Sequence, residues 1–310
     1  MKKKYDVLGL GAVAVDELLY VDQYPGADGK VEVLSRERQC GGLTATALVA
    51  AARLGSSCAY AGVLGEDDDD SRFAIEALRR EGIGLESLIL RPGARPIRSM
   101  IVVDKKSLTR TIFYDHQGVV GADDKFPAPS VIGSARVLLV DRVGIKGMIR
   151  AARIARQISV PVVADLERDT SPGVDELIEL SNHLIIPKHF ALKLTGQEEA
   201  YSAAETLSKR GQTVVVTCGD EGCWFSVNGD PAEHQRAFKV TTVDPTGCGD
   251  VFHGAYAHAL AHGATLTDRI RMAASSAAIK ATQHGGQSGI PTMDKLQEFM
   301  KEQFESGRHD

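Results

Sequence analysis

Short apolar runs alternate with longer amphipathic or alanine-rich stretches along most of the chain. The runs at residues 137–140, 160–164, 183–186 and 213–217 are rich in Val, Ile and Leu, which is typical of strands buried on both faces of a sheet. Because strands that alternate with helices form parallel sheets, the pattern predicts an α/β fold, with a doubly wound, mostly parallel sheet flanked by helices.

The same pattern places the remaining elements. Further strands are predicted at residues 5–10, 58–64 and 238–243, and a hairpin begins at 223–227 and turns at Asn228-Gly229. Four β-type runs, at residues 15–21, 30–34, 97–103 and 109–114, predict a small sheet that stands apart from the main one. Predicted helices cover residues 44–54, 71–80, 149–156, 174–180, 190–194, 200–209, 251–260, 267–282 and 293–303.

Composition narrows the function classes. The 310 residues are 43% hydrophobic and 25% charged, which is ordinary for a soluble globular protein of one large domain or two. A formal net charge of −5 gives no basic field, so nucleic acid is not an expected partner. The basic start precedes an apolar run too short for a signal peptide or a membrane span, so no membrane association is expected. Five cysteines without metal-ligand spacing are explained by reduced thiols, which favours a cytoplasmic location.

Two segments suggest function at first sight but have simpler interpretations. The run Gly9-Leu10-Gly11-Ala12-Val13-Ala14 looks like a dinucleotide-binding fingerprint, which must open a crossover helix. Here the chain reaches Pro25-Gly26 too soon for that helix, so a dehydrogenase is disfavoured. The acidic run at residues 66–70 is interpreted as a solvated loop whose last acids favour the N-terminus of the next helix.

The most specific motif is Asp244-Pro245-Thr246-Gly247-Cys248-Gly249-Asp250, which precedes the predicted helix at 251–260. Glycines let backbone N–H groups point inward together, and a helix N-terminus adds partial positive charge, so this turn is predicted to bind an anion. Asp250 has two interpretations: it caps the helix, or it takes part in chemistry beside the anion.

Three other segments have candidate ligand contacts. Asp16 follows the first strand's carboxyl end, where ligands collect in open α/β sheets. Gly41-Gly42 allows a ligand to approach the backbone closely or forms an ordinary turn. The loop from Thr217 through Gly219 to Gly222 contacts a phosphate or ribose or simply connects a hairpin.

Together these segments carry a family likeness. Asp16, Gly41-Gly42 running into residues 51–55, Thr217-Cys218-Gly219 and residues 244–254 occur in the order found in the ribokinase-like (PfkB) carbohydrate kinases, which the chain resembles over nearly its whole length. In motif detail it is most similar to the sulfofructose kinase and ketohexokinase members. The resemblance implies an α/β domain formed by residues 1–12, 41–95 and 118–310, and a β-sheet lid formed by residues 13–40 and 96–117, often shared across a homodimer.

The resemblance also implies an activity and its residues. The γ-phosphoryl group of ATP would pass to a hydroxyl of a small-molecule sugar, with Asp250 accepting the proton and the N–H groups of Gly247, Cys248 and Gly249 stabilising the transferred charge. ATP brings Mg²⁺, and a requirement for a monovalent cation stays open. Residues expected at the sugar are Asp16, Lys30, Gly41, Gly42, Thr46, Tyr114 and Arg142; those expected at ATP are Thr217, Gly219, Gly222, Thr246, Ala274 and Ala277.

Departures from the family pattern bear on the substrate. Thr46 stands where many relatives have Asn, and the Asn-x-x-Glu segment linked to magnesium is absent near residues 187–190, so the metal contacts are unknown. Lys30 and Arg142 match positions that hold a sulfonate in sulfofructose kinase, while Tyr114 replaces an Asn there. The hypothesis is a ketose-like or acidic sugar phosphorylated on a primary hydroxyl, although a solvated lysine and a structural ion pair also account for the two cations.

Two alternatives stay open. A nucleoside kinase would use the same chemistry on a different acceptor. A catalytically weak sugar or nucleotide sensor is favoured by the missing Asn-x-x-Glu and disfavoured by the complete Gly247–Asp250 turn.

Overall fold

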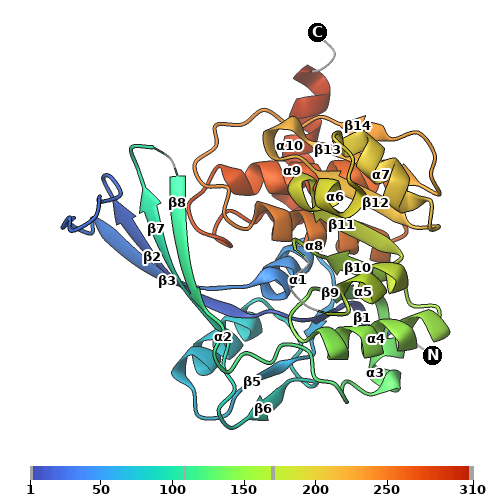
Figure 1. Ribbon diagram of the computed structural model, residues 1–310, viewed down its shortest axis with the longest axis horizontal. Coiled ribbons are helices and arrows are strands. Elements are labelled where there is room, and N and C mark those ends of the chain that lie inside the picture. Colours follow the sequence, from blue (N-terminus) through green and yellow to red (C-terminus); the bar gives the residue numbers. More distant parts are fainter. Residues whose placement is uncertain (1–2, 108, 169–171, 307–310) are drawn as a thin grey trace.

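The computed structural model describes residues 3–107, 109–168 and 172–306. Its central sheet has eight strands in the order β14-β13-β12-β11-β10-β9-β1-β4 (Figure 1). Antiparallel pairing adds β13 (Cys223–Val227) and β14 (Glu233–Gln235) at one edge. The strands that pair in parallel are β1 (Tyr5–Leu10), β4 (Cys58–Tyr60), β9 (Ala135–Val140), β10 (Val162–Asp165), β11 (His183–Pro187) and β12 (Thr213–Thr217).

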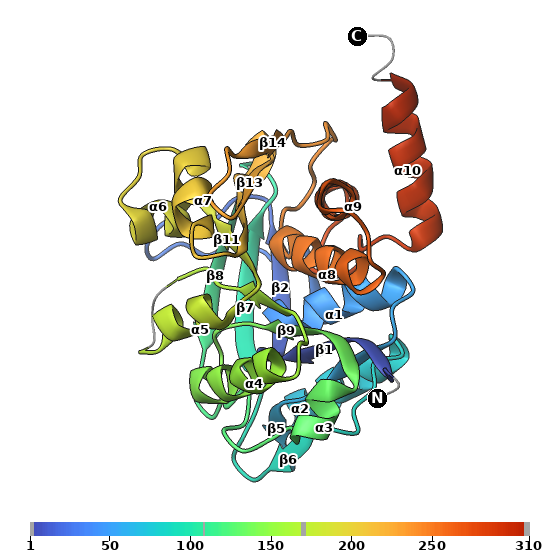
Figure 2. The ribbon, with the colours of Figure 1, turned by 90° about the vertical axis from the view of Figure 1, so that its right-hand side faces the viewer.

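Helices cover both faces of this sheet (Figure 2), because the side chains of each strand alternate between two hydrophobic cores. Val137 and Leu139 of β9 enter one core, and Leu138 and Val140 enter the other. The first core includes α1 (Leu43–Arg53), α2 (Asp69–Arg80), α8 (Cys248–Ala261), α9 (Leu266–Ala281) and α10 (Met293–Ser306); the second includes α3 (Pro129–Gly133), α4 (Ile145–Gln157), α5 (Val174–Leu180), α6 (Lys188–Thr195) and α7 (Ala200–Ser208). The predicted doubly wound fold is confirmed.

A second sheet of four strands stands beside the helical body (Figure 1). Its order is β3 (Ser35–Gly41), β2 (Ala14–Val21), β7 (Ile97–Asp104) and β8 (Thr109–Asp115). A small core of Leu18, Tyr20, Ile101 and Val103 lies on one of its faces. Because β2 begins only four residues after β1 ends, no crossover helix follows β1, which confirms that the glycine run there is not a dinucleotide fingerprint.

Three strand predictions were wrong. Residues 30–34 are irregular and exposed. The strand that pairs with β2 is instead the polar β3, and every residue of β3 takes part in the pairing. Residues 58–64 form two strands, because the chain leaves the main sheet after β4 and β5 (Val63–Gly65) pairs with β6 (Ile89–Arg91). Residues 238–243 form no strand and line a cavity. Backbone pairing outweighed side-chain propensity at β3.

The acidic run at residues 66–70 is also not a solvated loop throughout. The side chains of Asp68 and Asp70 are 15% and 16% exposed, whereas that of Asp69 is 86% exposed. Asp68 accepts a hydrogen bond from the Ser71 backbone and caps α2, in the way expected of the last acids in the run.

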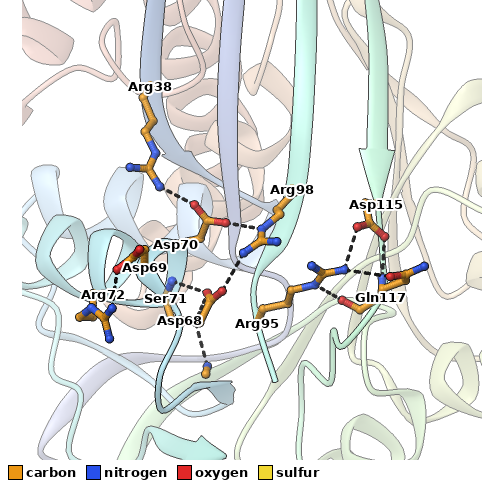
Figure 3. Close-up of polar contacts among 11 residues, drawn as sticks. Arg38, Asp68, Asp69, Asp70, Ser71, Arg72, Arg95, Arg98, Asp115 and Gln117 are labelled. Carbon is orange, nitrogen blue, oxygen red and sulfur yellow. Dashed lines mark hydrogen bonds and ion pairs between the residues drawn. The ribbon is translucent and has the colours of Figure 1, made fainter. Parts of the chain in front are cut away.

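The unexpected partners of this run are two arginines of the small sheet (Figure 3). Arg98 of β7 binds Asp68 at 2.7 Å and also binds Asp70, which in turn binds Arg38 of β3. These partners lie 28 to 32 residues away in the sequence, so local charge patterning could not reveal them. The four side chains join the small sheet to the N-terminus of α2.

We expect Asp70→Asn to lower the free energy of unfolding by about 1 kcal/mol, because two partly exposed arginines lose a shared charge while side-chain volume is kept. Asp69→Asn is the matched control, and its exposed pair with Arg72 should contribute less than about 0.5 kcal/mol. Urea unfolding measures both free energies, and equal effects of the two substitutions would contradict a stabilising contact between the small sheet and α2.

Candidate functional site

The glycine motif forms a tight turn at the N-terminus of α8. Gly247 is the N-cap residue, with φ at 77°, and a Cβ there would lie 2.7 Å from the Gly286 carbonyl oxygen. Only glycine fits such a left-handed and crowded position. The N–H groups of Cys248 and Gly249 thus begin a helix of 14 residues, where partial positive charge collects.

The carboxylate of Asp244 holds the turn in place. It accepts hydrogen bonds from the backbone N–H of Thr246 at 2.8 Å and of Gly285 at 2.9 Å. Burial alone would raise the pKa of Asp244, but these hydrogen bonds and the nearby Lys280 hold it below its ordinary value. Asp244 therefore stays charged and joins the turn to the loop that follows α9.

Asp250 lies in the first turn of α8. Burial raises the pKa of its carboxyl group well above the ordinary value, and the negative charge of Asp165 raises it further, while His253 opposes the shift. The negative charge of Asp16 raises this pKa to a smaller extent. A carboxylate with a raised pKa beside an anion-binding turn is suited to accept a proton.

Asp165 and His253 were not found from the sequence. Asp165 ends β10, and its Oδ2 lies 3.4 Å from Nδ1 of His253 on α8. The imidazole nitrogens also lie 2.7 Å from the Gly249 carbonyl oxygen and 3.0 Å from that of Ile185. His253 therefore joins α8 to the central sheet. The only feature of the sequence that pointed to His253 was its position three residues after Asp250.

On the small sheet, Asp16, Ser99 and Tyr114 stand in one row across β2, β7 and β8. Asp16 is buried and hydrogen-bonds Ser99, and burial raises the pKa of its carboxyl group to about 6. A Cβ on Gly41 would lie 2.1 Å from Asp16 Oδ2, so the glycine makes room for this carboxylate.

The other predicted sugar contacts lie in three places. Gly42 precedes α1, and the hydroxyl of Thr46, one turn later, accepts a hydrogen bond from Gln287 at 3.3 Å. Arg142 follows β9 and pairs with Glu167 at 3.3 Å. Lys30 is exposed in the segment between β2 and β3, and no contact within the described residues joins it to the others.

A second arginine, Arg168, extends the group around Arg142. It pairs with Glu167 at 3.0 Å and donates a hydrogen bond to the Tyr114 hydroxyl at 3.3 Å, so it connects the main body to the small sheet. Burial lowers the pKa of His116, and the charges of Arg142 and Arg168 lower it further. The sequence offered no periodic signal for this cluster, because its members come from three separate loops and strands.

A cavity of about 580 Å³ opens beside the turn. Its volume falls within the range of small-molecule sites. Thr246 is not among the lining residues, whereas the other predicted nucleotide contacts, Thr217, Gly219, Gly222, Ala274 and Ala277, all line it together with Cys248 and Gly249. The segment wrongly predicted as a strand contributes Phe238, Lys239 and Val240.

No cluster of three or more His, Cys, Asp or Glu side chains in the described ranges could hold a metal ion. The residues that replace the family's Asn-x-x-Glu have other contacts: Lys188 pairs with Glu221 at 3.2 Å, and His189 hydrogen-bonds the Glu167 carbonyl oxygen at 3.1 Å. The magnesium contacts therefore stay unassigned. The five cysteines are free. None of the described helices is both long and apolar enough to cross a membrane.

An open α/β sheet, a glycine turn at a helix N-terminus and an adjacent cavity of small-molecule size are features of α/β proteins that bind phosphate-bearing ligands. A family model of the pfkB family carbohydrate kinases matches residues 6–293, and the chain belongs to this family. It is a kinase that transfers phosphate to a sugar hydroxyl, as the resemblance implied, within a ribokinase family that also contains nucleoside kinases.

Individual relatives cover nearly the whole chain. The ribokinase of Haemophilus influenzae is 27% identical over an alignment of 317 positions, gaps included, which covers 97% of this chain and 99% of the relative. The nucleoside kinase of Methanothermobacter thermautotrophicus is 25% identical and covers 94% of each chain. The crystal structure of a candidate ribokinase from Agrobacterium tumefaciens is 28% identical, with a TM-score of 0.91 over 96% of this chain and 98% of the other. Solved structures that share the fold include kinases in complex with ATP, one of them also with Mg²⁺.

We expect Gly247→Ala to lower the free energy of unfolding by about 1–3 kcal/mol, because the new Cβ meets a backbone oxygen and the backbone is left-handed. Gly249→Ala is the matched control: its Cβ meets nothing within 4 Å, and alanine favours the helix by up to about 1 kcal/mol. Denaturant unfolding of both variants checks this, and equal losses would contradict the constraint at Gly247.

Proposed function

We propose that this protein is an ATP-dependent kinase that phosphorylates a hydroxyl, expected to be primary, of a ketose-like or acidic sugar in the cytoplasm. One observation carries the proposal: Asp250, whose carboxyl pKa is raised by burial, lies in the first turn of the helix that begins at the glycine turn. A proposed base and a proposed anion site thus lie together at the N-terminus of α8.

In the proposed reaction, the hydroxyl oxygen of the sugar attacks the γ-phosphorus of ATP, and Asp250 accepts the proton of that hydroxyl. The bond from that phosphorus to the oxygen it shares with the β-phosphate breaks, and ADP leaves with the electron pair. The backbone N–H groups of Gly247, Cys248 and Gly249 stabilise the charge on the transferred group. Such donors act through preorganisation, which the Asp244 hydrogen bonds provide here.

ATP fits the cavity beside the turn. Small side chains of Ala274 and Ala277 leave room for a flat base, and the loop from Thr217 to Gly222 borders the same space. Relatives solved with ATP and Mg²⁺ support this assignment for the family. Mg²⁺ would arrive with the nucleotide and neutralise phosphate charge.

An acidic or phosphorylated sugar is supported by the cations near Asp16. Arg142 and Arg168 both pair with the carboxylate of Glu167, so two guanidinium groups lie close together. Tyr114 places the small sheet against this group, and His116 lies beside it with its ring 5.0 Å from the tyrosine ring. A guanidinium group suits carboxylate, sulfonate or phosphate oxygens.

We further propose that the small sheet, residues 13–40 and 96–117, covers the sugar as a lid and forms a homodimer through its outer face. Asp16 and Tyr114 lie on one face of the sheet. Met100 and Phe113 lie opposite each other on the other face and are 49% and 53% exposed. Exposed apolar side chains of this kind are typical of interfaces.

A nucleoside kinase is the second candidate, supported by the nucleoside kinase among the relatives. ADP release with a panel of neutral sugars, anionic sugars and nucleosides distinguishes the candidates. Faster turnover of a nucleoside would favour the second candidate, and tight binding of sugar and ATP without ADP release would favour a sensor.

Asp250→Asn should lower kcat by about 10²- to 10⁴-fold, since the amide cannot accept the proton. ATP binding and the unfolding free energy should change little, because the side chains are nearly equal in size. Asp268→Asn, at the exposed start of α9, is the control and should keep normal turnover. Intact turnover in the Asp250 variant would falsify its role as base.

Arg142→Gln should raise KM for anionic sugars by about 10- to 100-fold, the equivalent of one charge-assisted hydrogen bond, and leave KM for neutral sugars within about twofold. Arg153→Gln, which removes a surface pair with Glu176, is the control. Steady-state kinetics on both sugar types measure this, and an equal loss for neutral and anionic sugars would exclude an anion contact at Arg142.

A further inference from the structure

Lys280 is a fully buried lysine that no step proposed above uses. It lies at 0% exposure in the last turn of α9, among the largest fully buried side chains of the described residues. An isolated ammonium group is costly to bury, so a lysine in such a place needs a partner or a task.

The contacts of Lys280 do not form an ordinary ion pair. Its Nζ donates to the backbone carbonyl oxygen of Asp244 at 2.7 Å. The Asp244 carboxylate is already engaged by Thr246 and Gly285, and no carboxylate pairs with Lys280 within the described part of the chain. An ammonium group has three N–H donors, and two of them have no partner among the described residues.

The ammonium group of Lys280 lies at the end of α9, which is hydrogen-bonded to the start of the anion-binding turn. The N–H groups of Val243 and Asp244 donate to the Ala281 carbonyl oxygen at 2.8 and 3.1 Å, so the end of α9 is fastened to the start of the turn. Burial raises the pKa of the Cys248 thiol, while the charge of Lys280 opposes that shift. The other charged groups that act on Cys248 are Asp244, Asp250 and Arg110.

We propose that Lys280 is a positioning residue whose ammonium group fixes the Asp244 carbonyl and serves as an internal cation at the start of the glycine turn, so that phosphoryl transfer needs no added monovalent cation. The proposal rests on the kinase function proposed above. A fixed positive charge in a site of low dielectric stabilises developing negative charge without reorganisation. A purely structural alternative is that Lys280 only complements the C-terminal dipole of α9.

Kinetics with ATP-Mg²⁺ and the best sugar, in potassium, ammonium and tetramethylammonium buffers, test the proposal. Wild-type kcat should agree within about twofold in all three buffers. Lys280→Met should lower kcat in tetramethylammonium by about 10- to 100-fold, with KM for the sugar within about threefold. Potassium or ammonium should restore part of the loss, and Lys280→Arg should keep more activity than Lys280→Met.

The control is Arg271→Met, an exposed position on the same helix, which should keep normal kcat in every buffer. A wild-type kcat that rises tenfold or more with potassium would overturn the proposal, even if Lys280→Met fails to fold. Wild-type turnover in a folded Lys280→Met variant would also overturn it.

Thiol alkylation separates this proposal from the kinase function. Cys40, Cys58 and Cys223 are buried, so in a Cys218→Ser background iodoacetamide reports mainly on Cys248. Lys280→Met should slow alkylation at pH 8 by about three- to tenfold and move its pH midpoint upward, because the thiolate loses a nearby positive charge. An unchanged pH midpoint would contradict a positive charge beside Cys248 and would overturn the proposal. If the pH midpoint of Cys248 alkylation shifts but no acceptor is phosphorylated, the proposed kinase function fails, whereas the position of the Lys280 charge beside Cys248 is supported.

Discussion

The buried carboxylate of Asp244 is the constraint on which the site depends. By accepting hydrogen bonds from Thr246 and Gly285, it holds the glycine turn against the loop after α9. Its own carbonyl oxygen is held by Lys280. The same contacts set where α8 begins and therefore where Asp250 lies, so the position of the proposed base follows from a few interactions behind the turn rather than from contacts of its own.

Polar contacts also join the small sheet to the main body. The arginines of β3 and β7 bind the acids at the start of α2, and Tyr114 of β8 meets Arg168 of the main body. These polar contacts are partly exposed, so each is weak and easily replaced by water. Val15 of β2 and Cys40 of β3 belong to the first hydrophobic core, so apolar packing fixes the base of the small sheet and the weaker polar contacts add to it.

The fold could be predicted from the sequence to a large extent because its signals are local. The apolar runs at β1, β12 and β13 and the helical pattern of α5 match the observed elements. The glycine turn was found because its spacing is short and specific. Errors arose where distant partners decide: β3 is polar in sequence but pairs with β2, and Asp70 looks solvated but binds two arginines of the small sheet. Lys280, His253 and Arg168 were missed for the same reason, since their importance comes from burial and from neighbours far along the chain.

The central claim is that Asp250 acts as a base whose pKa is raised by burial and by Asp165. The pH dependence of kcat/KM tests it most directly, because that profile reports the ionisation of the free enzyme. A base must be deprotonated to act, so activity should be present above the raised pKa and fall tenfold per pH unit below it, with a midpoint clearly above the ordinary aspartate pKa of about 3.9. A kcat/KM that stays constant down to about pH 4 in a folded enzyme would contradict the account.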